Sequence, residues 1–369
     1  MFIVPGDVTM KFHKRLMSSL LLSAILSTML IICVNVWFRP LSVLTGVFLF
    51  RDFTRRLSPP TTQDNSPCIH DFLKSVEPTV DLEEFCGSSW NRSDILCEQF
   101  FFQNGLTIKD NCLLPKDNNI VPRIVYYVIF SPEPGKPPLF LFMHYLSVVS
   151  ARRFISPWAI YVISDAPPYG YWWTRVLSDV RGVRFVFRPA PRLTPDKLAF
   201  IQHASDIVRL QALIVNGGIY LDTDMLILRP IDALLNISLT MGLIDDGTGM
   251  GNAFIVAERN SGFLREWYSG YRHYNKSLIF ENSLWAAKRL WLKRKESVNE
   301  IASMIYRPNW FESAKLFKQS GYDWKSRYGV HIWHRHGHVP ENPDEMKRLN
   351  TTLGEMFRFV YYGSEKMVQ

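Results

Sequence analysis

After residue 121, short runs of β-branched and aromatic residues alternate with longer apolar stretches that have helical spacing. The short runs are bounded by Pro, Gly or Asp and predict strands at residues 123–130, 158–164 and 183–188. The apolar stretch between the first two, residues 139–153, predicts a helix. Strands that alternate with helices are typical of an α/β sheet with parallel strands, and the rest of the chain suits an irregular C-terminal lobe.

Residues 16–38 form a longer apolar run without a charged side chain, which is enough to cross a hydrocarbon core of about 30 Å. Lys11, Lys14 and Arg15 precede this run, and no clear cleavage site follows it. The pattern predicts a single N-terminal transmembrane helix, a signal anchor, after a cytosolic tail at residues 1–15. A buried core helix is the alternative, which the length of the run disfavours.

Four of the five cysteines fall between the anchor and residue 120, at positions 68, 86, 97 and 112. Such clustering suits an oxidising lumen, where two disulfides in any of three connectivities would form. A zinc site is the rival interpretation, but no C-x-x-C pair supports it. Glycosylation sequons begin at Asn91, Asn236, Asn275 and Asn350. We therefore expect a type II protein with a luminal, cysteine-containing stem at residues 39–120, followed by a folded luminal domain at residues 121–369.

The composition excludes several classes of protein. The 369 residues are 47% hydrophobic, which excludes a disordered chain, and the one long apolar run excludes a polytopic membrane protein. A formal net charge of +8 favours anionic ligands such as phosphates. Because there is no arginine-rich arm and no zinc-finger spacing, we expect no nucleic-acid partner.

The most informative stretch lies at residues 194–231. A helix is expected over residues 200–216, ended by Gly217-Gly218, and residues 219–221 read as a short apolar strand. Asp222 and Asp224 then follow at the carboxyl end of that strand, where ligands bind in open α/β sheets. In an extended segment these two carboxylates would share a face, about 6–7 Å apart. Their mutual repulsion favours a bound cation, and Mg²⁺ or Mn²⁺ suits carboxylate and phosphate oxygens.

Asp206 and Arg209 are three residues apart on the expected helix and so share one of its faces. The carboxylate offers an acceptor for sugar hydroxyls, and the guanidinium offers a cation for a phosphate or a contact for a ribose. A bare D-x-D is a weak signal, because chance matches and surface turns are common. The combination of helix, Gly-Gly turn, apolar strand and D-x-D is much more specific.

That combination resembles the glycosyltransferase family 32 signature S-D-x-x-R…L…G-G-x-Y-x-D-x-D. The family includes yeast α-1,6-mannosyltransferases and animal α-1,4-galactosyl- and α-1,4-N-acetylglucosaminyltransferases. Here the signature stands as SDIVR at residues 205–209, Leu213, and GGIYLDTD at residues 217–224. The resemblance spans roughly residues 121–260. It implies a GT-A-like fold, which is a Rossmann-type mixed sheet flanked by helices. It also implies a nucleotide-sugar donor (UDP by default, GDP as the alternative) and Mn²⁺ or Mg²⁺ as cofactor. Finally, it implies retention of the anomeric configuration and a location in the Golgi membrane.

The resemblance also implies residue roles. Asp224 and Asp222 are the expected catalytic pair: Asp224 binds the metal directly, and Asp222 acts through water or holds the donor ribose and sugar. Asp206, Arg209 and Asn252 are expected to contact the donor. The acceptor would be a glycan or glycolipid, and the transferred group a hexose or N-acetylhexosamine.

A late His-x-Trp pair, His331 and Trp333, matches another family pattern. By resemblance His331 completes the metal shell and Trp333 lies at the donor; a separate zinc site or a plain surface loop is the alternative for this His-rich stretch. The family's first strand carries a Trp that stacks on the donor base, but Ile129 stands there in this chain. Tyr126, or else Tyr127, is the candidate replacement.

Two other functions remain open from the sequence. A haloacid-dehalogenase-type phosphatase also has Asp-x-Asp at a strand end, but the upstream helix and Gly-Gly turn have no role in that chemistry. A catalytically silent protein that binds a glycan or a partner enzyme is the other alternative. The intact carboxylates argue against it, and Ile129 keeps it open.

Overall fold

The computed structural model describes residues 118–131, 133, 136–188, 190–191, 200–245 and 248–367. These residues contain a seven-stranded sheet of order β3-β2-β1-β4-β7-β6-β8 and a two-stranded sheet of β5 and β9. The strands are β1 (Ile124–Val128), β2 (Ala159–Ser164), β3 (Val183–Phe187), β4 (Gly218–Leu221), β5 (Met225–Ile227), β6 (Leu239–Asp245), β7 (Gly249–Ala257), β8 (Asn299–Glu300) and β9 (Gly329–His331).

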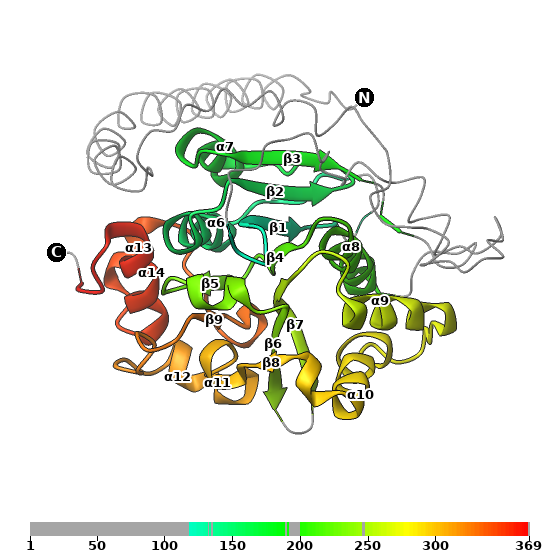
Figure 1. The fold of residues 1–369 in the computed structure, drawn as a ribbon. Helices are drawn as coiled ribbons and strands as arrows, with labels where there is room; N and C mark the ends of the chain where they lie inside the picture. The colour runs from blue at the N-terminus through cyan, green and yellow to red at the C-terminus, as the bar shows by residue number, and fades with distance from the viewer. Residues whose placement is uncertain are drawn as a thin grey trace, which may run out of the picture. The chain divides into compact units, whose positions relative to one another are not determined.

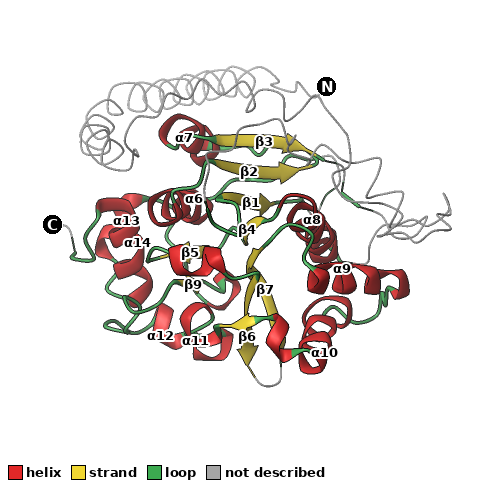
Figure 2. Cartoon of the chain, viewed as in Figure 1, coloured by secondary structure: helices red, strands yellow, loops and turns green. Residues whose placement is uncertain are grey.

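Helices cover both faces of the large sheet (Figures 1 and 2). On one face lie α8 (Ile201–Asn216), α9 (Gly262–Ser269) and α10 (Ala286–Lys293). On the other lie α6 (Phe142–Ile155), α7 (Tyr171–Asp179), α11 (Ala302–Ile305), α12 (Ala314–Phe317), α13 (Pro343–Arg348) and α14 (Thr352–Tyr362). The fold is therefore a mixed α/β sheet with flanking helices, as the sequence predicts.

The predicted parallel strands pair as expected. β1 is parallel to β2 and to β4, and β2 is parallel to β3. β7 then runs antiparallel to both β4 and β6, which makes the sheet mixed. Every residue of β1 is buried, because helices cover both of its faces.

Two glycines join α8 to β4. Gly217 has φ +67° and Gly218 has φ +120°, both in the region that favours glycine. A Cβ atom at Gly217 would lie 2.7 Å from the Arg259 backbone nitrogen, and one at Gly218 would lie 2.7 Å from the Ile124 carbonyl oxygen. The predicted Gly-Gly turn is confirmed, and it leads the chain from α8 directly into β4, the strand that the two aspartates follow.

The expected helix at residues 139–153 is displaced: α6 begins at Phe142 and continues to Ile155. Leu139 instead forms an isolated bridge with Tyr169, and the Phe140 nitrogen donates to the Tyr169 carbonyl. The cytosolic tail, signal anchor and cysteine-bearing stem all fall outside the described residues. Within the described ranges, no helix is both long enough and apolar enough to cross a bilayer.

Candidate active site

Asp222 and Asp224 lie in a tight turn between β4 and β5. The Met225 nitrogen donates to the Asp222 carbonyl at 3.0 Å, and the Asp222 nitrogen donates to the Ala253 carbonyl of β7 at 2.8 Å. The expectation of an extended segment is therefore wrong, because the chain makes a turn here before it enters β5. The turn nevertheless keeps the two carboxylates together, beyond the carboxyl end of β4.

His331 joins them from a distant part of the sequence. β5 pairs with β9 so that Met225 lies opposite His331, and the Ile332 nitrogen donates to the Asp224 carbonyl. One ligand atom each from Asp222, Asp224 and His331 lie within 4.8 Å of one another. Two carboxylates and an imidazole suit a hard or borderline divalent cation. The His331 Nδ1 atom is also buried without a hydrogen-bond partner among the described residues, so the side chain retains a free nitrogen.

Two imidazoles contact Asp224. His331 Nε2 lies 3.0 Å from Oδ1, and His334 Nδ1 lies 3.1 Å from Oδ2. Burial alone raises the pKa of Asp224, but the two histidines outweigh burial and hold that pKa well below its ordinary value. For His331, burial lowers the pKa and the carboxylate of Asp224 raises it, and the net pKa is raised. Asp224 is therefore an anion that is ready to bind a cation.

Arg209 contacts the remaining predicted site residues. Its Nη2 lies 3.3 Å from Asp206 Oδ1, and its Nη1 lies 3.2 Å from Asp222 Oδ1. Nη1 also donates to the Asn252 carbonyl at 2.6 Å, and the guanidinium lies 4.2 Å from the centre of the Tyr220 ring. Burial lowers the pKa of Arg209, but Asp222, Tyr220 and Asp206 raise it by more than burial lowers it. The net pKa is therefore raised, and the guanidinium stays charged.

Asp206 is held by two neutral side chains as well as by Arg209. Asn252 Nδ2 donates to Oδ1 at 2.7 Å, and the Tyr271 hydroxyl donates to Oδ2 at 3.3 Å. Burial raises the pKa of Asp206, and Arg209 offsets part of that rise. The structure thus brings the predicted residues Asp206, Arg209 and Asn252 into one network. The Tyr220 hydroxyl, which donates to Asp222 Oδ1 at 2.6 Å, extends the network to the turn.

Trp333 lies beside this centre, whereas Tyr126 does not. The Trp333 ring is 3.8 Å from the His331 ring, and its Nε1 donates to the Pro308 carbonyl at 3.2 Å. Tyr126 is fully buried in the core beneath α8 and stacks on Tyr161. Tyr127 is equally buried on the opposite face of the sheet. The prediction that one of these tyrosines stacks on a donor base is therefore wrong, because both faces of β1 are covered.

Sequence reasoning gave no role to His334, Tyr271 or His144. His144 lies on the first turn of α6, where its Nδ1 accepts from the Leu141 nitrogen at 3.1 Å. Burial lowers its pKa to about 4, Asp224 opposes this shift, and His334 adds to it. No local pattern marks Tyr271 or His144, since each reaches the site through tertiary packing. His334 lies in the His-rich stretch at residues 331–338, whose His-x-Trp pair indicates His331 instead.

The low pKa of His144 predicts a loss of stability in mild acid. In the unfolded chain a histidine protonates below its ordinary pKa of about 6.5, whereas folded His144 stays neutral until about pH 4. The unfolded state therefore binds more protons across this window, and stability falls as the pH falls through it. Urea unfolding at pH 7 and pH 4 should show a drop larger by about 3 kcal/mol in the wild type than in His144→Gln. Equal drops in both proteins would contradict the assignment.

Residues 162–239, which run from within β2 to the first residue of β6, match the family described as "Glycosyltransferase sugar-binding region containing DXD motif". The chain is 29% identical over 241 residues to "Glucan organizing enzyme 1" of Cryptococcus neoformans var. grubii serotype A. That alignment covers 59% of this chain and 64% of the relative, so the chain spans less than two thirds of the relative's length.

Two solved structures are also similar. "PaToxG Glycosyltransferase" has a TM-score of 0.35 at 16% identity, over 47% of this chain and 68% of that chain. The apo-form glycosyltransferase GlyE of Streptococcus pneumoniae TIGR4 has a TM-score of 0.39 at 11% identity, over 65% of this chain and 60% of that one.

The matched region includes four of the residues that build the centre: Asp206, Arg209, Asp222 and Asp224. This part of the chain is therefore similar to the sugar-binding region of DXD-containing glycosyltransferases, as the signature predicts.

Proposed function

We propose that this chain transfers a hexose or N-acetylhexosamine from a nucleotide sugar, by default a UDP-sugar, to a glycan or glycolipid acceptor. The main support for the proposal is that two groups of residues lie side by side. Asp222, Asp224 and His331 form one group, and the Asp206–Arg209–Asn252 network forms the other. A donor has a diphosphate, which needs a cation, next to a sugar, which needs hydrogen-bonding groups. The Asp222–Asp224–His331 cluster would supply the cation site, and the Asp206–Arg209–Asn252 network would supply the hydrogen-bonding groups.

Asp222, Asp224 and His331 would hold Mn²⁺ or Mg²⁺. When bound, the cation neutralises the charge that develops on the departing diphosphate. Arg209 fixes Asp222 from one side, while His331 and His334 fix Asp224 from the other. Because these partners are held within the fold, the carboxylates need little reorganisation to bind the cation.

Asp206 and Asn252 would face the donor sugar. The side chains of Asp206 and Arg209 are only 4% and 5% exposed, so most of their hydrogen-bonding capacity is used inside the protein. Arg209 therefore serves mainly as a positioning residue that keeps Asp206, Asp222 and the Asn252 carbonyl in fixed relation. Asn252 is half-buried and offers the more accessible contact.

The resemblance supports a GT-A-like catalytic domain and a retaining mechanism. The apolar run at residues 16–38 supports a type II Golgi membrane protein with its catalytic domain in the lumen. The phosphatase alternative is disfavoured by the site, because Oδ1 of Asp222, the first Asp of the motif, already contacts Arg209 and Tyr220 and is poorly placed as a free nucleophile.

The experiment uses the full chain purified in detergent with a panel of UDP- and GDP-sugars. We expect slow hydrolysis of one donor class that requires Mn²⁺ or Mg²⁺ and stops when EDTA is added. Adding the metal back should restore it. A folded protein that hydrolyses no donor with either metal would favour the silent, glycan-binding alternative. Metal-dependent cleavage of a simple phosphate monoester would favour the phosphatase.

A further inference from the structure

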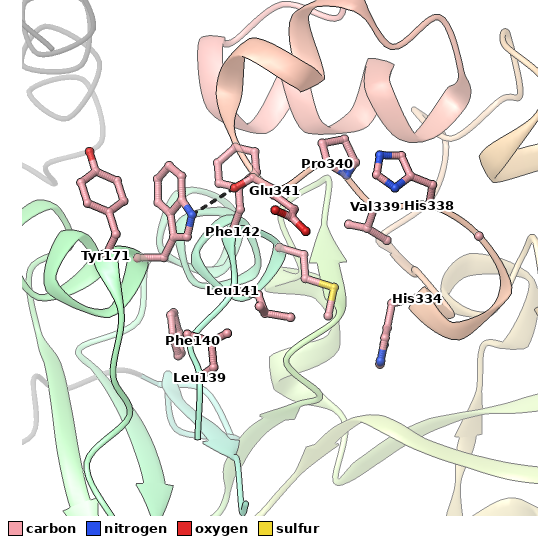
Figure 3. Close-up of a pocket in the computed structure, with 13 residues that line it drawn as sticks. Leu139, Phe140, Leu141, Phe142, Tyr171, His334, His338, Val339, Pro340 and Glu341 are labelled. Atoms are coloured by element: carbon pink, nitrogen blue, oxygen red, sulfur yellow. Dashed lines mark hydrogen bonds between the residues drawn. The ribbon is translucent and has the colours of Figure 1, made fainter. Parts of the chain in front are cut away.

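A cavity of about 480 Å³, whose lining residues are drawn in Figure 3, includes His334, the neighbour of Asp224. Three segments line it: residues 139–143 at the start of α6, residues 171–172 at the start of α7, and residues 334 and 337–341 before α13. Its volume falls within the range of about 300–1,000 Å³ that is usual for small-molecule sites. None of the functions described above uses this cavity.

The lining is rich in aromatic rings. Phe140, Phe142, Tyr171 and Trp172 all contribute, with apolar Leu141 among them. The Phe142 and Trp172 rings are 4.4 Å apart, and Trp172 Nε1 donates to the Glu341 carbonyl at 3.2 Å. This hydrogen bond ties α7 to the segment before α13. Such a lining suits a flat, partly apolar group, since aromatic rings stack on any planar ligand.

The position of the cavity limits what that group can be. Strand order reverses between β1 and β4, because the chain proceeds from β1 to β2 and β3 and then returns to the other side of β1. Ligands of open α/β sheets bind beyond the carboxyl ends of the strands at such a point. Asp222 and Asp224 follow β4 on one side of it. The cavity lies on the other side, where the chain leaves β1 and β2 for α6 and α7.

His334 links the two places. His334 lines the cavity (Figure 3). Its Nδ1 lies 3.1 Å from Asp224 Oδ2. One side chain thus contacts both places, so a ligand whose anionic end is held by a cation at Asp224 has its other end within reach of the cavity. A nucleoside diphosphate has this shape, with a flat base at one end and a diphosphate at the other.

We propose that this aromatic cavity binds the nucleoside end of the donor. The inference rests on the proposed function and deepens it. The base then stacks on rings from α6 and α7 rather than on the first strand, where Ile129 stands and both tyrosines are buried.

The test fills the cavity without touching the core. Leu141 lines the cavity and is 39% exposed, so Leu141→Trp adds bulk at its mouth. Leu177→Trp, at a 49% exposed position on α7 outside the cavity, is the matched control. Calorimetry with the full chain in detergent and saturating Mn²⁺ measures the affinity for UDP, GDP and inorganic pyrophosphate, and circular dichroism checks folding.

In the wild type and in Leu177→Trp, the better nucleotide should bind about ten-fold or more tightly than pyrophosphate, because a stacked base adds affinity. In Leu141→Trp this ratio should fall toward one while pyrophosphate affinity is kept. A ratio that is near one in the wild type, or unchanged in Leu141→Trp, would overturn the inference and leave the metal–diphosphate site standing. If neither nucleotide nor pyrophosphate binds the folded wild type, the proposed function fails as well.

Discussion

Replacing Asp224 with asparagine should lower metal-dependent donor hydrolysis by about 10³-fold, because a preorganised charge at the leaving group commonly contributes about that much. Asparagine has nearly the same shape, and the backbone bond from Ile332 to the Asp224 carbonyl is unaffected, so the fold should survive. The variant loses only the negative charge of the Asp224 carboxylate, which His331 and His334 keep ionised. Initial rates at saturating metal and donor, with circular dichroism alongside, measure the effect.

The control for this variant is Asp344→Asn. That carboxylate lies on the surface of α13 and pairs only with Lys347 among the contacts described, so its neutralisation should leave the rate unchanged. If folded Asp224→Asn keeps its rate within about three-fold of wild type, Asp224 does not hold the catalytic cation.

Replacing Arg209 with methionine should destabilise the fold by about 3–5 kcal/mol, because removing one member of a buried ion network leaves its partners uncompensated. Asp206 would lose the guanidinium that lies 3.3 Å from its Oδ1, and Asp222 would lose one of the groups that fix it. Urea unfolding monitored by tryptophan fluorescence measures the change.

Two further variants separate charge from packing at Arg209. In Arg209→Met/Asp206→Asn the buried uncompensated charge is gone, so part of the lost stability should return. Arg294→Met removes an exposed ion pair with Glu266 and should cost about 0–1 kcal/mol. A loss no larger for Arg209→Met than for Arg294→Met would mean that the network contributes little to stability.

A feature of the fold or of the candidate site can be predicted from the sequence when neighbouring residues determine it. The path from α8 through Gly217 and Gly218 to β4 was predicted because helix spacing, backbone freedom and an apolar run are properties of neighbouring residues. The same stretch placed Asp222 and Asp224 at a strand end. It could not show that the chain turns there, because the turn exists to start β5, whose partner β9 lies about a hundred residues later.

Long-range packing explains the remaining differences. Its place on the first strand makes Tyr126 a candidate for the donor base, but the run of apolar residues there reflects burial on both faces. His334 reaches Asp224 only because of the β5–β9 register and the turn after it. The aromatic cavity draws its lining from three segments, and no spacing within any one of them indicates that they meet.

Whether Asp222 and Asp224 hold the cation is tested most directly by titrating Mn²⁺ into the full chain in detergent. Free Mn²⁺ is followed by electron paramagnetic resonance. We expect one ion bound per chain, held more tightly when a nucleoside diphosphate is present, and no such binding in Asp222→Asn/Asp224→Asn. Equal Mn²⁺ binding by the wild type and this double variant would show that the two carboxylates after β4 are not the metal centre.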